Sequence, residues 1–342
     1  MKNGKERIFA AAFAVLAALL LGLAGLALRP ARVNYGAVWG PYRAEPADSL
    51  DYLYLGSSYA YCDVNPALVY DASGLTGYVL AGPEQTLSQT YYYLKEALRT
   101  QSPQAVILEA SALHFARYQS YTQINVGYMP FSRNKLAAIF RASEPELRTG
   151  LLFELYFYHD RWKQVSPGDV LDTFAPDRTD LLKGYTAVDG LASGLEDGPF
   201  RRPTQEEDLY QENLAWLGKI LTLCEQEGIL PLVVFHPTYS RFAPQVYTQI
   251  AADVAALSPS ALCLDWSGDF ASAGLDPLTH LYDAGHLNRA GAARFSAWLG
   301  VYLTRDAGLT PRPQTAENTA ARQLLKNVSQ RAPQRAAPPR YL

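Results

Sequence analysis

Short apolar runs that alternate with helix-forming segments limit the fold of this chain more than any other feature of its sequence. In the first part, apolar runs lie at 50–56, 78–82 and 105–108. The segment 65–74 opens with Asn-Pro and closes with glycine, which is typical of a helix. The segment 86–99 opens with a Thr-x-x-Gln capping box and carries an apolar face at helical spacing. The sequence therefore predicts strand, helix, strand, helix and strand in this order.

The same alternation returns toward the C-terminus. Helices are predicted at 204–226, at 244–257 and from Asn288 to about 304, and strands at 230–235 and 261–265. Parallel strands joined by helices use right-handed crossovers, and the helices cover both faces of the sheet. The predicted fold is therefore α/β, a doubly wound parallel sheet of five strands of the flavodoxin-like type.

Between these two parts the alternation stops. Residues 114–203 are predicted to form a largely helical insertion, with helical pieces around 135–140 and 151–156. The whole domain is expected to span 49–304. The tail 305–342 is rich in proline, alanine, arginine and glutamine, a composition unsuited to a packed core, so it is predicted to be disordered.

The N-terminal segment 8–28 contains 21 residues without a charge or a proline. As a helix it is roughly 30 Å long, which matches the hydrocarbon thickness of a bilayer. The sequence thus predicts a single transmembrane anchor. The slight excess of basic residues before it favours a cytoplasmic stretch 1–7 and places the linker 29–48 outside. A cleaved signal peptide is the alternative, because 25–27 offers small residues for a peptidase, although the apolar run is long for one. Both interpretations make the remaining chain extracytoplasmic.

The overall composition excludes several classes of partner. The 342 residues carry a formal net charge of −3 with scattered lysines and arginines, so no nucleic-acid partner is expected. Cys62, Cys224 and Cys263 lie far apart and allow at most one disulfide. The five histidines lack zinc-motif spacing, so neither a metal nor another cofactor is expected. Single histidines are typically structural or solvent-facing, although His236 follows a predicted strand and could line the cleft.

Two polar segments are predicted to meet at the carboxyl edge of the sheet, where ligands bind in folds of this class. The first strand ends in Gly-Ser-Ser, which places the Ser58 hydroxyl where the chain turns toward a helix. The segment Asp283-Ala284-Gly285-His286 immediately precedes the last helix. His286 can act as a base for Ser58 while Asp283 holds the other ring nitrogen. Each segment alone is also typical of an ordinary turn or cap, but their shared edge favours one active site of Ser58, Asp283 and His286.

Four stretches of the chain resemble a known family. They are YLGSSYAYCDVNP, GPEQTLSQTYYYLKEAL, VILEAS and DAGHLNRAGA. They resemble the SGNH/GDSL hydrolase superfamily, and more closely its membrane-anchored bacterial group related to the teichoic-acid D-alanylation protein and the alginate O-acetylation proteins. The resemblance covers most of 50–113 and 204–304. It implies that Ser58 is the nucleophile and that Asp283 and His286 complete the triad.

The chain departs from the superfamily at two blocks. The first block reads Gly-Ser-Ser instead of Gly-Asp-Ser, and 109–111 reads Glu-Ala-Ser where the superfamily has Gly-x-Asn-Asp, so one oxyanion donor is missing. The glycine of the second block falls within 82–85, which makes Gly82, Glu84 and Gln85 candidates for oxyanion or substrate binding. The backbone N–H of Ser58 is a further natural donor. Loss of one donor typically costs about 10²- to 10³-fold in rate, so slow hydrolysis is expected.

The expected function is acyl transfer through an acyl-serine, which water or a sugar hydroxyl then resolves. The resemblance and the anchor favour an esterase or acyltransferase that acts on a cell-surface polysaccharide or a teichoic-acid-like polymer. The resemblance also implies a membrane-bound O-acyltransferase as a partner that supplies the acyl group. Two alternatives are a non-catalytic scaffold that binds polymer or partner, and a secreted hydrolase of small esters. The acyl group, the acceptor and the choice between hydrolysis and transfer stay open.

Overall fold

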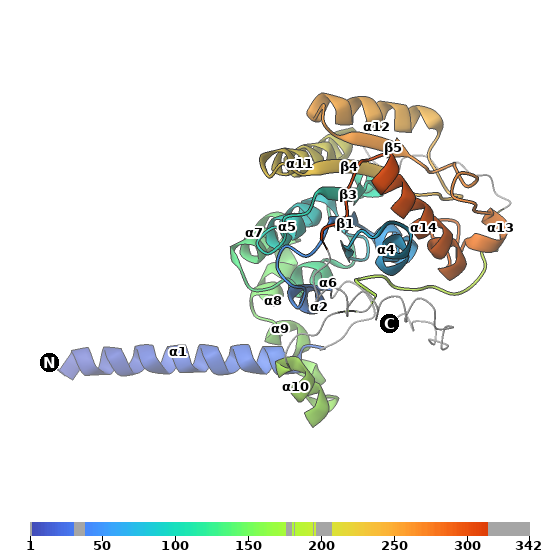
Figure 1. Cartoon of the computed structure of the whole chain (residues 1–342). Helices are drawn as coiled ribbons and strands as arrows, with labels where there is room; N and C mark the ends of the chain where they lie inside the picture. The colour runs from blue at the N-terminus through green and yellow to red at the C-terminus, as the bar shows by residue number, and fades with distance from the viewer. Residues whose placement is uncertain are drawn as a thin grey trace.

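A parallel sheet of five strands lies at the centre of the protein, in a computed structural model that describes residues 2–30, 38–175, 180, 182–193, 195 and 207–313 (Figure 1). The strands are β1 (Tyr52–Gly56), β2 (Gly77–Ala81), β3 (Ala105–Glu109), β4 (Leu230–Phe235) and β5 (Leu262–Asp265). Their order is β2-β1-β3-β4-β5, one of the two common doubly wound arrangements. The predicted five-stranded parallel α/β sheet is confirmed, with β4 at its predicted bounds and the other strands within one or two residues of theirs.

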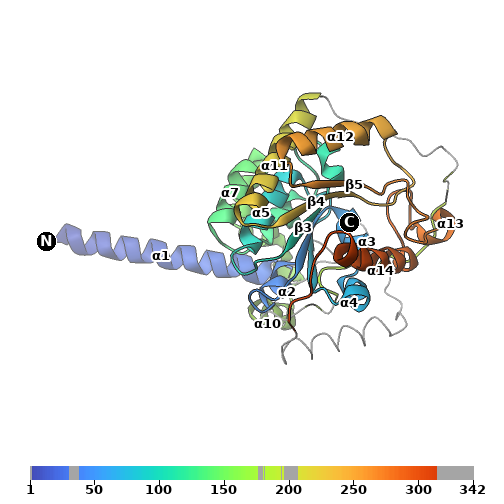
Figure 2. The same cartoon turned by 45° about the horizontal axis from the view of Figure 1, so that its top comes forward.

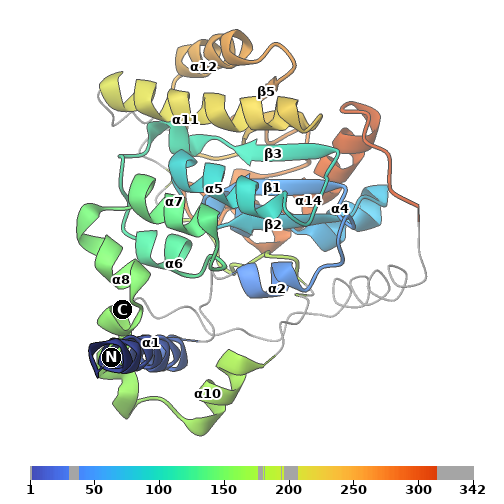
Figure 3. The same ribbon diagram turned by 90° about the vertical axis from the view of Figure 1, so that its left-hand side faces the viewer.

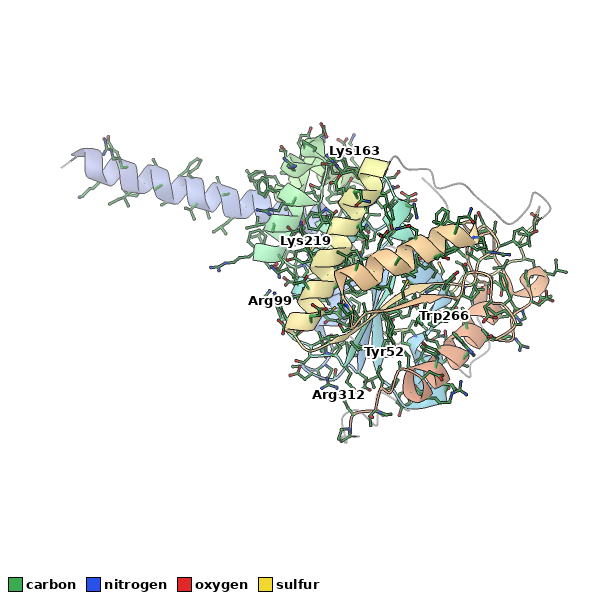
Figure 4. All side chains as sticks on the ribbon, turned by 90° about the horizontal axis from the view of Figure 1, so that it is seen from above. Tyr52, Arg99, Lys163, Lys219, Trp266 and Arg312 are labelled. Carbon is green, nitrogen blue, oxygen red and sulfur yellow. The ribbon has the colours of Figure 1, made fainter. Side chains whose placement is uncertain are left out.

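Helices cover both faces of this sheet (Figure 2). One face is covered by α5 (Leu87–Ala97), α11 (Glu207–Gln226) and α12 (Pro244–Leu257), and the other by α3 (Ser58–Asp63), α4 (Pro66–Ser73) and α14 (Arg289–Arg305). Alternate side chains of each strand enter opposite clusters: Leu53 and Leu55 face α5, whereas Tyr52 and Tyr54 face α14. Tyr52 and Trp266, labelled in Figure 4, both belong to the α14 side. Burial on both faces explains why the strands read as continuous apolar runs.

Of the three helix caps that the sequence predicts, two form as expected. The side chains of Asn65 and Asn288 cap α4 and α14. The capping box predicted at the start of α5 forms only in half. Thr86 accepts the N–H of Gln89 at 3.4 Å, but the Gln89 amide donates to Thr122 in the insertion at 3.1 Å instead of returning to Thr86. A tertiary contact thus replaces half of the local motif.

The insertion after β3 is helical over its described first part. Its elements are η1 (Ser111–His114), α6 (Thr122–Gly127), α7 (Arg133–Arg141), η2 (Pro145–Leu147), α8 (Arg148–Leu152), α9 (Leu155–Tyr158), η3 (His159–Lys163) and α10 (Pro167–Phe174). The helical piece predicted around 135–140 is α7, whereas the piece around 151–156 consists of the end of α8 and the start of α9. Residues 176–179, 181, 194 and 196–203 of the predicted insertion, and the predicted helix start at 204, lie outside the described residues.

The packed domain begins earlier and ends later than the predicted span 49–304. Within the predicted linker 29–48, α2 (Trp39–Arg43) buries two aromatic side chains in the core on the α5 side. At the other end, α14 continues to Arg305 and the chain packs onto the domain as far as 313, because Leu309 is buried and Arg312 binds backbone oxygens of two loops. The packed domain therefore extends from 38 to 313. Residues 31–37 and 314–342 lie outside the described residues.

The N-terminal helix α1 (Lys2–Leu28) projects away from the sheet (Figures 1 and 3). Its segment Gly4–Leu28 is long and apolar enough to cross a membrane. From residue 4 to Leu23 nearly all of its side chains are exposed, whereas Gly25 is buried against the backbone of Leu155 in the insertion. The predicted single apolar helix is thus present as a separate element beside the domain.

Candidate active site

The turn between β1 and α3 places two serines in opposite environments. Gly56 ends β1 with φ +150°, in the backbone region that favours glycine. A Cβ atom on Gly56 would lie only 2.8 Å from Cβ of Glu109 on the neighbouring strand, so a side chain has no room there. Ser57 after this turn is fully buried, whereas Ser58 is partly exposed at the carboxyl edge. The turn therefore presents Ser58, and not Ser57, to a substrate.

The loop before α14 is folded around the carboxylate of Asp283. Asp283 Oδ1 accepts the backbone N–H of Gly285 at 2.7 Å and of His286 at 2.8 Å. Leu281 and Leu287 pair as an antiparallel bridge on either side of this turn. The Asp283 carboxylate therefore orders its own loop. The turn also brings the ring of His286, three residues later, within reach of this carboxylate.

The three predicted catalytic residues form one hydrogen-bonded chain. His286 Nε2 lies 2.8 Å from Ser58 Oγ, and His286 Nδ1 lies 3.0 Å from both carboxylate oxygens of Asp283. The His286 ring is stacked on the ring of Tyr59, with centroids 4.8 Å apart and planes at 17°. These distances lie within hydrogen-bonding range for a nucleophile, a base and an orienting carboxylate. The structure thus brings together residues that are 228 positions apart in the chain.

The electrostatic surroundings favour protonated His286. Burial lowers the pKa of His286, but its hydrogen bond to the Asp283 carboxylate and the nearby charges of Asp63, Asp283 and Glu109 outweigh burial, and the pKa stands above its usual value. For Asp283, burial raises the pKa, but the hydrogen bonds from His286 and from two backbone N–H groups lower it by more, so the net shift is downward. Asp283 stays ionised and can stabilise the imidazolium that forms when His286 accepts a proton.

A fully buried polar chain supports the catalytic loop from behind. Asp63 at the end of α3 accepts the backbone N–H of Leu287 at 2.9 Å and lies 3.0 Å from Nδ1 of His236. The other nitrogen of His236 lies 2.5 Å from the Tyr54 hydroxyl. Burial lowers the pKa of His236 to about 4, so its ring is neutral. This series of hydrogen bonds connects Leu287, the residue after His286, to α3, to the end of β4 and to β1.

Sequence reasoning assigned none of these supporting roles. His236 gave the one available signal, since it directly follows β4 at the carboxyl edge. Glu109, at the end of β3, stands where the superfamily's third block would begin, but its buried carboxylate points to the turn. It accepts the Ser57 hydroxyl at 3.1 Å and the Ser111 N–H at 2.8 Å. Glu109 therefore holds the turn that presents Ser58.

The three oxyanion candidates lie at the same edge, because Gly56 pairs with Ala81 in the sheet register. A Cβ atom on Gly82 would meet Asn125 Oδ1 at 2.1 Å, so the insertion packs directly on this glycine. Glu84 has φ +45° and its carboxylate accepts the Ser120 N–H at 3.2 Å. The Gln85 amide is buried and donates to Thr90 at 2.9 Å. Across the described part of the chain, no hydrogen bond joins Gly82 or the side chains of Glu84 and Gln85 to Ser58, Asp283 or His286.

No family model matches this chain, and no curated protein is significantly similar to it. The chemical role of the site is therefore inferred from its geometry. A partly exposed hydroxyl, a base in direct hydrogen-bond contact with it and an ionised carboxylate behind the base are the groups needed to activate a serine nucleophile.

Proposed function

We propose that the protein is a serine-dependent acyl esterase or acyltransferase. The observation that carries the proposal is the chain from Asp283 through His286 to Ser58, with 3.0 and 2.8 Å between the bonded atoms. Its position at the carboxyl edge of a doubly wound sheet agrees with where such folds bind ligands. The motifs that resemble the membrane-anchored SGNH/GDSL group support the same assignment.

The first half-reaction forms an acyl-serine. Ser58 Oγ attacks the carbonyl carbon of the ester while its proton passes to His286 Nε2. The tetrahedral intermediate collapses, the bond from carbon to the leaving oxygen breaks, and the departing alcohol takes the proton from His286. Asp283 keeps its charge throughout and holds the imidazolium by its Nδ1–H.

The second half-reaction releases the acyl group. Water or a sugar hydroxyl gives its proton to His286 Nε2 and attacks the acyl carbon, and the collapse of this intermediate returns the proton to Ser58 Oγ. The negative oxygen formed in each half-reaction needs backbone donors, and the N–H groups of Ser58 and Gly82 at the two adjacent strand ends are the ones we assign. The asparagine donor of the superfamily is absent, so turnover is expected to be slow.

The proposed setting is the outer face of a cell membrane. α1 would anchor the chain as a single span, with the domain on the extracytoplasmic side, and the substrate would be a cell-surface polysaccharide or a teichoic-acid-like polymer. A membrane-bound O-acyltransferase would supply the acyl group from inside. The apolar length of α1 and the quoted motifs support this assignment.

Labelling of the full chain with a fluorophosphonate tests the proposal. Wild type is expected to be labelled on the peptide that contains Ser58, and Ser58→Ala and His286→Ala are expected to abolish labelling. Ser102→Ala, at an exposed serine far from the turn, is the control and should be labelled like wild type, whereas Ser57→Ala loosens the turn and should lower labelling without abolishing it. If wild type is not labelled and both active-site variants keep the cell-surface acylation phenotype, the catalytic assignment is wrong and the protein acts as a scaffold.

A further inference from the structure

A set of exposed apolar side chains on the insertion has no role in the proposed active site. It consists of Phe153, Tyr156, Trp162, Leu171 and Phe174, which we call the apolar collar, and each of these side chains is more than half exposed. Large apolar side chains that gather on a surface mark a site of interaction with a protein or a membrane. The collar begins at Phe153, between α8 and α9, and extends over α9, η3 and α10, the elements that pack against α1.

The packing between the collar elements and α1 is close and specific. Gly25 of α1 is buried, and a Cβ atom there would lie 2.9 Å from the backbone nitrogen of Leu155. Just beyond the helix, Arg29 pairs with Glu154 at 2.9 Å, and Arg161 donates to the carbonyl of Leu28. The backbone of α9 therefore lies against the last turns of α1, and one ion pair and one hydrogen bond hold it there.

This packing sets the depth of the collar relative to a membrane. The apolar run 8–28 is roughly 30 Å long, which is the thickness of the hydrocarbon core. Gly25 and Leu28, which contact the insertion, fall within only the last 6 Å or so of that length. When α1 spans a bilayer, the collar elements lie at the outer boundary between acyl chains and headgroups. Interfacial helices bury their apolar faces about 5–10 Å into this boundary.

The chemistry of the collar fits this boundary. Tryptophan and tyrosine are enriched at membrane interfaces, and basic side chains bind anionic headgroups. Lys163 lies 5.3 Å from the centre of the Trp162 ring, so the two side chains present a cation and an aromatic ring together. On α10, Leu171 and Phe174 fall on one helical face at a spacing of three residues, whereas the acidic residues 169 and 172 fall on the opposite face.

We propose that the apolar collar inserts into the leaflet on the domain's side of the membrane and that its ligand is a bilayer with anionic headgroups. The collar then acts as a second contact beside α1 and fixes the orientation of the domain. The inference rests on the anchoring role of α1 within the proposed function, and it is independent of whether Ser58 is catalytic.

The test uses the full chain in vesicles of phosphatidylcholine and phosphatidylglycerol, with or without dibrominated acyl chains. A polarity-sensitive NBD label is attached at Leu171→Cys in a Cys263→Ser background, because Cys263 is the one native cysteine that is not buried. Leu278→Cys on α13 (Pro277–His280) is the matched control, since Leu171 is 73 % and Leu278 is 74 % exposed. Leu19→Cys reports on α1 itself.

The proposal predicts that the label at 171 shifts its emission to shorter wavelength and is quenched by the brominated lipid, while the label at 278 does neither. Quenching at 19 without quenching at 171 would overturn the docking proposal and leave the anchor intact, and the collar would then be a protein-binding face. No quenching at either position would overturn both. Fluorophosphonate labelling of Ser58 is unaffected by these outcomes, so the two proposals fail separately.

Discussion

At the scale of single residues, the site depends on a division of labour between two adjacent serines. Gly56 permits a turn that no residue with a side chain could make so close to Glu109, and the turn sends Ser57 inward and Ser58 outward. Ser57 hydrogen-bonds to a buried carboxylate, whereas Ser58 meets His286. The choice of Ser58 over Ser57 as the proposed nucleophile thus follows from backbone geometry, since the two side chains are chemically the same.

The role of Asp283 gives a prediction about pH. His286 must be neutral to accept the Ser58 proton, so acylation is expected to fall as the pH drops through the pKa of His286, which is raised above its usual value. Asp283→Asn keeps the oxygen that accepts the N–H groups of the loop but removes the charge that favours imidazolium. Acylation should fall by up to about 10⁴-fold, and its acid limb should move to lower pH. Rates of acylation by an activated ester, measured across pH, check both effects.

The same pKa shift has a consequence for stability with the opposite sign. A histidine whose folded pKa is raised contributes stability that is present below its unfolded pKa and is lost as the pH rises through the folded pKa. His286→Gln should therefore lose more stability at acidic than at neutral pH. If the variant loses the same unfolding free energy at acidic and at neutral pH, the pKa of His286 is not raised in the folded protein. Asp283 would then only orient the histidine by its hydrogen bond.

The buried position of Asp63 predicts a stability difference between two variants. Asp63→Ala leaves the Leu287 N–H without an acceptor in a fully buried place, which should cost about 1–3 kcal/mol. Asp63→Asn keeps an oxygen for this donor and should lose less. Denaturant unfolding of both variants measures the difference. If both lose the same free energy, the hydrogen bond to the catalytic loop is not what Asp63 provides.

At the scale of elements, the alternation of apolar runs and caps was enough to predict the five strands and the helices between them. It was also enough to place Ser58, Asp283 and His286 together, because parallel strands bring their carboxyl ends to one edge. It did not predict α2 or the roles of Asp63 and Glu109. A five-residue helix carries too few residues for a periodic pattern, and the direction of a carboxylate depends on partners more than 50 residues away.

The assignment of α2 to the core predicts a contrast between two tryptophans. Trp39 is 2 % exposed and packs edge-on against Tyr42 and Tyr93, with ring centroids 5.6 and 4.9 Å away. Trp39→Ala should cost about 3–5 kcal/mol of unfolding free energy. Trp162→Ala, at a residue that is 65 % exposed, should change it by about 0.5 kcal/mol or less in detergent. If the two variants lose the same unfolding free energy, α2 is not part of the core and residues 38–48 form a linker.

At the scale of the whole molecule, the long helix and the sheet have a defined relation. Figure 3 looks along α1, and β1, β2 and β3 lie across the view. With α1 across a bilayer, the strands therefore run along the membrane surface, and the carboxyl edge with Ser58 opens sideways over it. Such an orientation suits a polymer that lies along the cell surface, and the apolar collar would maintain it.

The central claim is that Ser58 carries an acyl group. The most direct measurement is the intact mass of the full chain after brief exposure to p-nitrophenyl acetate, followed by peptide mapping. We expect one added acetyl group on the peptide that contains Ser58, no acetyl group there in Ser58→Ala, and acetylation that disappears when His286 is protonated at low pH. If the wild-type protein stays unmodified, or if the acetyl group is found on a residue other than Ser58, Ser58 is not the nucleophile.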